Sequence, residues 1–70
     1  MYKYEIILHW SAEDSAFIAE VPELPGCIAH GDTDELALKN VKEAINLWIE
    51  TAIEFNDEIP IPKEKRLIFA

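Results

Sequence analysis

Hydrophobic and polar residues alternate over the first ten positions of the chain. One side of this alternation is entirely apolar and consists of Tyr2, Tyr4, Ile6, Leu8 and Trp10. The opposite side is mixed and consists of Lys3, Glu5, Ile7 and His9. A period of two with aromatic and β-branched residues is typical of a strand buried on one side. We therefore expect a strand over residues 2–10 whose apolar side faces the core.

A second alternating run follows at residues 16–21, in which Phe17, Ala19 and Val21 share one side. The residues between the two runs, 11–15, are mostly polar. A short polar connection between two alternating runs is typical of a β-hairpin. The pattern therefore predicts that the first two strands pair in the antiparallel direction.

The segment of residues 21–33 holds both glycines of the chain and two of its four prolines. Proline restricts φ and lacks a backbone donor, whereas glycine permits a positive φ or a close approach of two backbones. We expect Pro22 to end the second strand, residues 27–30 to form a short third strand, and Gly31 to close it. The composition thus predicts a fixed loop and not a flexible linker.

From residue 34 onward the apolar positions recur at steps of three and four, which predicts a helix. Thr33 is suited to the N-cap, and Asp32, Asp34 and Glu35 place negative charge near the positive end of the helix dipole. The predicted apolar stripe consists of Ala37, Val41, Ala44, Ile45, Trp48, Ala52 and Phe55. Asn56 is expected to end the helix in the left-handed conformation.

Residues 59–62 read Ile-Pro-Ile-Pro and are expected to run extended, and residues 67–69 are expected to form a final strand. The prediction is an α+β fold of order βββαβ, a small antiparallel sheet with one helix packed on one face. We expect a single domain that spans residues 1–70.

One helix covers only one face of such a sheet, so the apolar residues elsewhere need another explanation. The positions concerned lie on the opposite sheet face or beside the helix stripe, and they are Ile7, His9, Ile18, Leu36 and Leu47. We interpret them as candidates for an interface with a partner or with a second copy of the chain. For the two helix residues a solvated surface stays an alternative, because exposed aliphatic residues are common.

The size and charge of the chain limit its partners. A 70-residue domain has a small core, and its single cysteine, Cys27, allows no internal disulfide, so association is the expected source of further stability. The formal net charge of −8, from 14 acidic and six basic residues, disfavours nucleic acids and suits a basic protein partner, or serves solubility alone. No apolar run is long enough for a membrane span, and the N-terminus lacks the layout of a signal peptide. We therefore expect a cytoplasmic protein without a membrane partner.

The sequence contains no convincing metal or cofactor motif. His9 and His30 are the only histidines, and no closely spaced ligand pair accompanies them. Cys27 and His30 stand three residues apart on a predicted strand, so they should point to opposite faces. We expect neither a metal nor a cofactor.

No set of residues indicates catalysis either. Ser11 and Ser15 have acidic neighbours but fall in the predicted hairpin turn, where short polar residues are usual. Three carboxylates share the outward side of the helix, Glu43, Glu50 and Glu54. A solvated surface explains them better than a metal site, because nothing apolar surrounds them. Trp10 and Trp48 are expected in the core, so the sequence predicts a binding protein and no enzyme.

The order of several residues in the central segment resembles the HicB family of antitoxins. These residues are Pro22, Leu24, Pro25, Gly26, Cys27, Gly31, Asp32 and Thr33, and we expect them to serve the structure. The helix continues the family pattern with Asn40, Glu43-Ala44 and Trp48-Ile49. The resemblance extends from about residue 2 to residue 62.

The resemblance implies a partial ribonuclease-H-like fold that has lost catalytic power. It also implies a partner, a small basic HicA-like toxin that cleaves mRNA and whose active site the antitoxin covers. Homo-oligomers, as dimers or tetramers, are expected as well. The alternatives are a homo-oligomeric regulatory or structural module without a toxin, and a degenerate nuclease.

The sequence departs from the family pattern at three places. Ala16 stands where the family often has glycine, and Leu36 is an unusual apolar residue in the first helical turn. Many HicB proteins carry a C-terminal DNA-binding segment, and the sequence ends at Ala70 without one. We therefore expect a short family member that does not bind nucleic acid by itself.

Overall fold

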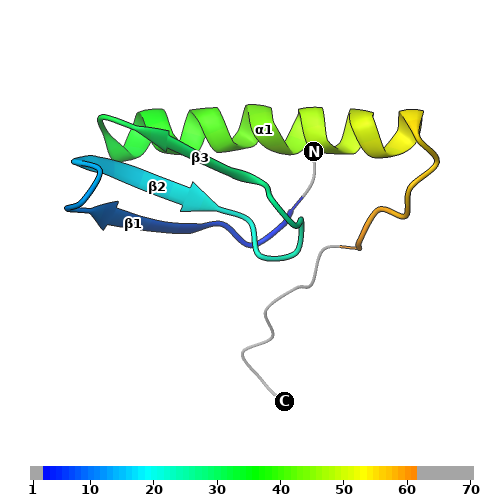
Figure 1. The fold of residues 1–70 in the computed structure, drawn as a ribbon, viewed down its shortest axis with the longest axis horizontal. Helices are drawn as coiled ribbons and strands as arrows, with labels where there is room; N and C mark the ends of the chain where they lie inside the picture. The colour runs from blue at the N-terminus through cyan, green and yellow to red at the C-terminus, as the bar shows by residue number, and fades with distance from the viewer. Residues whose placement is uncertain (1–2, 62–70) are drawn as a thin grey trace, which may run out of the picture.

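A computed structural model describes residues 3–61 of the protein. Three strands, β1 (Ile7–Ser11), β2 (Ala16–Glu20) and β3 (Ile28–Gly31), precede one long helix, α1 (Asp34–Glu54). Figure 1 shows α1 lying along one face of the sheet, with the segment after it turning back toward the strands. The predicted α+β order of three strands and a helix is confirmed. The strand predicted at residues 67–69 lies outside the described residues.

The sheet has the order β1-β2-β3, and both strand pairs are antiparallel. Leu8 lies opposite Ala19, whereas Ile18 lies opposite His9 on one side and His30 on the other. Residues directly opposite each other project from the same face of a sheet. The register therefore separates a face that α1 covers from a face that no described element covers.

Local hydrogen bonds explain the hairpin turn and the loop that follows β2. Asp14 donates its backbone N–H to Ser11 Oγ over 3.2 Å, which closes the turn that the sequence predicts. In the loop, Val21 N–H donates to Cys27 O (3.0 Å) and Cys27 N–H donates to Leu24 O (2.9 Å). The β2–β3 connection is therefore held by its own backbone, as its proline and glycine content predicts.

The ends of α1 follow directly from the sequence. Thr33 Oγ1 accepts the backbone N–H of Leu36 over 3.1 Å, as an N-cap residue does. Asn56 has a φ of +59°, the left-handed conformation predicted for it. Asp57 N–H then donates to Ala52 O over 2.8 Å and satisfies one of the last helical carbonyls.

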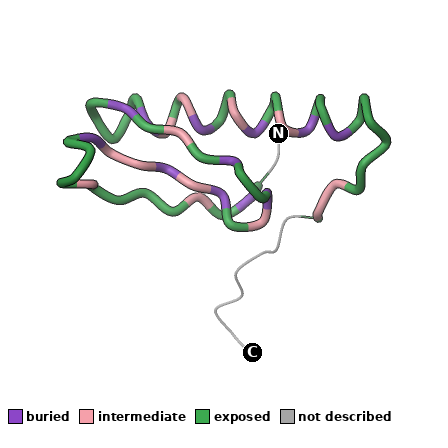
Figure 2. Tube along the Cα trace, in the orientation of Figure 1, coloured by how far each residue is buried: buried purple, intermediate pink, exposed green. Residues whose placement is uncertain are grey.

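The core lies between α1 and the strands β2 and β3. Its buried members come from the segment before β1, from β2, from the β2–β3 loop and from one side of α1: Tyr4, Ala19, Val21, Leu24, Cys27, Ala37, Val41, Ile45 and Ile49. Leu24 and Val41 are the largest side chains that are fully buried. Figure 2 shows that buried positions recur along the side of α1 that faces the sheet.

The structure corrects the prediction for the first strand. β1 begins at Ile7, and residues 3–6, which the sequence predicts in this strand, lie outside it. Leu8 and Trp10 are 40% and 52% exposed although they lie on the sheet face that α1 covers. The reason is the position of α1, which packs mainly on β3 and β2 and only slightly on β1. Trp10 instead packs edge-to-face on Phe17, with 5.1 Å between the ring centroids.

Most of the predicted apolar stripe of α1 is confirmed, and the structure differs from it at Phe55, Ile49 and Trp48. Phe55 is 68% exposed, because the helix ends at Glu54 and Phe55 is the C-cap residue. Ile49, which the predicted stripe omits, is buried four residues after Ile45. Trp48 lies at the margin of the stripe and is only half-buried.

Candidate functional site

The sheet face that α1 does not cover is the first candidate surface. We call it the open face and use this name for the six residues at its centre, Ile7, His9, Ile18, Glu20, Ile28 and His30; the Ser11–Ala16 pair lies at its end beside the hairpin turn. The register arranges them in two rows across the three strands. His9, Ile18 and His30 form one row, and Ile7, Glu20 and Ile28 form the other.

The open face holds three isoleucines and only one carboxylate, so it carries little charge for a chain of net charge −8. Ile7 and Ile28 are 42% and 56% exposed. Its one carboxylate, Glu20, lies 3.7 Å from Nε2 of His9, and both side chains are about half exposed. An exposed pair of this kind contributes little to stability. The open face therefore combines exposed isoleucines with one weakly interacting pair of polar side chains.

The five predicted interface residues do not form one surface. Ile7, His9 and Ile18 lie together on the open face, as predicted. Leu36 and Leu47 lie on α1 and not on the sheet. Their exposed fractions are 40% and 64%. Their role in an interface stays a prediction.

Sequence reasoning missed two members of the open face. Ile28 and His30 lie opposite Glu20 and Ile18, respectively. Alternation along residues 27–30 is a signal that could have identified them. In a strand, Cys27 and Ala29 point to one face and Ile28 and His30 to the other. The structure shows this alternation, since Cys27 is buried and Ala29 half-buried, whereas Ile28 and His30 are exposed.

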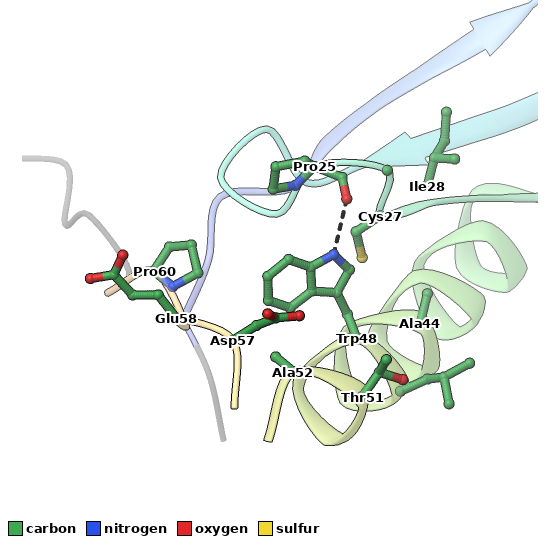
Figure 3. Close-up of a pocket in the computed structure, with 12 residues that line it drawn as sticks. Pro25, Cys27, Ile28, Ala44, Trp48, Thr51, Ala52, Asp57, Glu58 and Pro60 are labelled. Atoms are coloured by element: carbon green, nitrogen blue, oxygen red, sulfur yellow. Dashed lines mark hydrogen bonds between the residues drawn. The ribbon is translucent and has the colours of Figure 1, made fainter. Parts of the chain in front are cut away.

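The second candidate surface is a groove between the β2–β3 loop, α1 and the segment after the helix. It has a volume of about 630 Å³, and we call it the Trp48 groove. The residues that line it include Pro25, Leu47, Trp48, Asp57 and Pro60. Figure 3 shows the indole of Trp48 in the middle of the groove, where its Nε1–H donates to Pro25 O over 2.9 Å. The hydroxyl of Tyr4 donates to Pro60 O and thereby ties the far wall to the N-terminal segment.

The residues of the family-like segment build the loop and the start of the helix. Leu24 and Cys27 are buried in the core, and Gly26 has a φ of +81°. Gly31 is buried against the first turn of α1, and Thr33 caps that helix. Pro22, Pro25 and Asp32 are exposed.

Cys27 is a buried free thiol, and burial raises its pKa. A raised pKa in the folded state means that folding favours the protonated thiol. The resulting stability is present below the pKa of the unfolded thiol and is lost as the pH rises through the folded pKa.

We therefore expect Cys27 to react slowly with a disulfide reagent in the native protein at pH 8 and rapidly in denaturant, because the thiolate is the nucleophile. Urea unfolding should show a lower free energy of unfolding at pH 10 than at pH 7. This decrease should be smaller in the Cys27→Ala variant than in the unaltered protein. Equal labelling rates in native and denatured protein would contradict the burial of this thiol.

Within residues 3–61, no group of three His, Cys, Asp or Glu side chains is placed to hold a metal ion. Glu43, Glu50 and Glu54 are exposed on the outer side of α1. No described helix combines the length and the apolar character that crossing a membrane requires.

Known proteins resemble this chain in sequence and in fold. A UPF0150 protein of Thermoplasma acidophilum is 43% identical over 58 residues, which cover 83% of each chain. A UPF0150 protein of Synechocystis is 40% identical over 57 residues, covering 81% of this chain and 77% of its own. The crystal structure of the N-terminal domain of the Burkholderia pseudomallei antitoxin HicB superposes with a TM-score of 0.72 at 32% identity, covering 86% of this chain and 69% of that one. The family model for the HicB-like antitoxin of bacterial toxin–antitoxin systems matches residues 4–68. The chain therefore belongs to the family of HicB-like antitoxins.

Proposed function

We propose that this protein is an antitoxin that binds a small, basic, HicA-like toxin and blocks its cleavage of mRNA by covering the active site. Family membership is the observation that carries this proposal. Inhibition by coverage requires a shaped surface and no catalytic group, which suits a domain with two candidate contact surfaces.

The distribution of charge supports a basic partner. Three of the six basic residues lie near the end of the sequence, and they are Lys63, Lys65 and Arg66. The net charge of residues 3–61 is therefore more negative than that of the whole protein. Opposite charge on two proteins accelerates their encounter and favours the correct partner. The same charge repels the phosphate backbone of RNA and DNA, so the toxin and not its substrate is the expected ligand. A cytoplasmic location is part of the proposal, because mRNA is the target of the toxin.

The open face supports self-association as a second part of the proposal. Glu20 is its only acidic residue, so two copies could meet there with less repulsion than on the acidic outer side of α1. A dimer or tetramer would bury the exposed isoleucines. The same observation favours the second candidate function, a homo-oligomeric module without a toxin.

The test is a titration of this protein into an RNA-cleavage assay of the small basic protein encoded beside it. We expect cleavage to fall in proportion to the protein added and to cease at a fixed stoichiometry. An unrelated acidic protein of similar size and charge is the control for electrostatic effects on the toxin. Undiminished cleavage would overturn the antitoxin function and leave the homo-oligomeric module. RNA cleavage by this protein alone with a divalent metal would favour a nuclease.

A further inference from the structure

We propose that the Trp48 groove binds an arginine side chain of a basic protein partner. The proposal depends on the proposed function only for the identity of that partner as the toxin. The preference of the groove for a guanidinium group follows from the groove itself.

The groove provides a fixed aromatic surface. The Nε1–H of Trp48 is held by Pro25 O at 2.9 Å, so the plane of the indole is set before any ligand arrives. Pro25 and Pro60 form rigid walls on two sides, and the hydroxyl of Tyr4 holds Pro60 by its carbonyl. A site that is ordered in advance loses little conformational entropy when it binds.

A carboxylate stands at the edge of this aromatic surface. Asp57 lines the groove beside Trp48, and its backbone bond to Ala52 O over 2.8 Å fixes its place after the helix. Glu58 also lines the groove, with its carboxylate pointing outward past Pro60 in Figure 3. Both side chains are exposed, and no cation among residues 3–61 forms an ion pair with either of them.

Together these features fit a guanidinium group better than other ligands. Arginine stacks its planar, weakly hydrated head on an indole and donates two parallel hydrogen bonds to a carboxylate. Lysine offers neither the plane nor the paired donors. The volume of about 630 Å³ falls within the range of sites that hold small ligands, so a whole side chain and its backbone fit. The acidic edge disfavours phosphate groups.

The first experiment measures the fluorescence of Trp48 in a Trp10→Phe variant, in which it is the only tryptophan. The probes are N-acetylarginine amide and N-acetylcitrulline amide, which have nearly the same shape and differ in charge. We expect a saturable change of emission with the arginine probe and at least about tenfold weaker binding of the citrulline probe, since tenfold corresponds to about 1.4 kcal/mol. Equal responses to the two probes would overturn the proposal.

Matched variants identify the carboxylate. Asp57→Asn should weaken binding of the arginine probe at least about tenfold, the lower end of the range for one hydrogen bond to a charged group. Glu43→Gln makes the same change of charge on the outer side of α1 and should leave the affinity unchanged. Equal losses in the two variants would mean that only net charge matters and would overturn the site.

Tighter probe binding after Lys63, Lys65 and Arg66 are changed to glutamine would assign the groove to the chain's own basic residues and overturn its assignment to a partner.

The second experiment repeats the titration of toxin activity with Asp57→Asn. We expect the Asp57→Asn variant to inhibit the toxin at least about tenfold more weakly than the Glu43→Gln variant, consistent with loss of one charged contact. Toxin inhibition that is unaffected by Asp57→Asn would remove the toxin as the partner. If the unaltered protein fails to inhibit while the arginine probe still binds selectively, the proposed function fails and the groove assignment stands.

Discussion

Replacement of Gly31 by alanine is expected to remove most of the stability of this protein. A Cβ atom at this position would lie 2.5 Å from the backbone N of Ala37 and 2.8 Å from the backbone C of Leu36. Both atoms belong to the first turn of α1, so the helix itself would have to move away from β3. Overpacking of this kind costs about 3 kcal/mol at the upper end of its usual range. A domain of this size has a total stability of only about 3–5 kcal/mol.

Gly26→Ala is the matched control for this prediction. No atom lies within 4 Å of a Cβ built at Gly26, but its φ of +81° is unfavourable for alanine. The cost of the left-handed conformation is about 1–2 kcal/mol. Urea unfolding followed by circular dichroism should therefore show a smaller loss for Gly26→Ala than for Gly31→Ala. The reverse order would contradict the close approach of β3 and α1.

A charge at Ile18 is expected to disrupt association while the monomer stays folded. Ile18 lies in the middle of the open face, between His9 and His30 in the register, and its side chain is half-buried in the isolated chain. Ile18→Lys would bring an unpaired ammonium group into any interface that covers this face. We expect the affinity of self-association to fall at least about tenfold, because burial of an unpaired charge costs well over the 1.4 kcal/mol that tenfold requires.

Light scattering over a range of concentrations measures the association, and circular dichroism checks the fold. Ile53→Lys is the control, since Ile53 is 62% exposed on α1 and lies away from the open face. Toxin affinity should be measured for both variants, because the open face is also a candidate for that contact. The interface is placed wrongly if assembly and toxin affinity are the same for Ile18→Lys and the unaltered protein.

Local signals predicted the elements of this fold well because their causes are local. Thr33 caps α1 through an atom three residues away, and Asn56 ends it through its own φ. The spacing of residues 27–30 correctly separated Cys27, in the core, from His30, on the surface. The order of prolines and glycines in residues 22–33 was sufficient to identify the family, since that loop and the helix start depend on specific backbone conformations.

The position of α1 across the sheet was not predictable in this way. The alternation of β1 marks the correct face for Trp10, but burial depends on how far α1 extends over the sheet. Because α1 packs on β3 and β2, Trp10 stays exposed at the edge. Phe55 shows the same effect along the chain, since a periodic stripe does not state where the helix ends.

The sequence by itself determined the class of the fold, the family, the acidic character and three residues of the open face. These properties follow from periodicity, from backbone preferences and from composition, all of which act within a few residues. Only the tertiary structure placed Ile28 and His30 beside Ile18 through strand register. It alone also brought Pro25, Trp48 and Asp57 to one groove, because they come from a loop, a helix and the segment after it. Their meeting depends on how α1 packs against the sheet, which no local pattern contains.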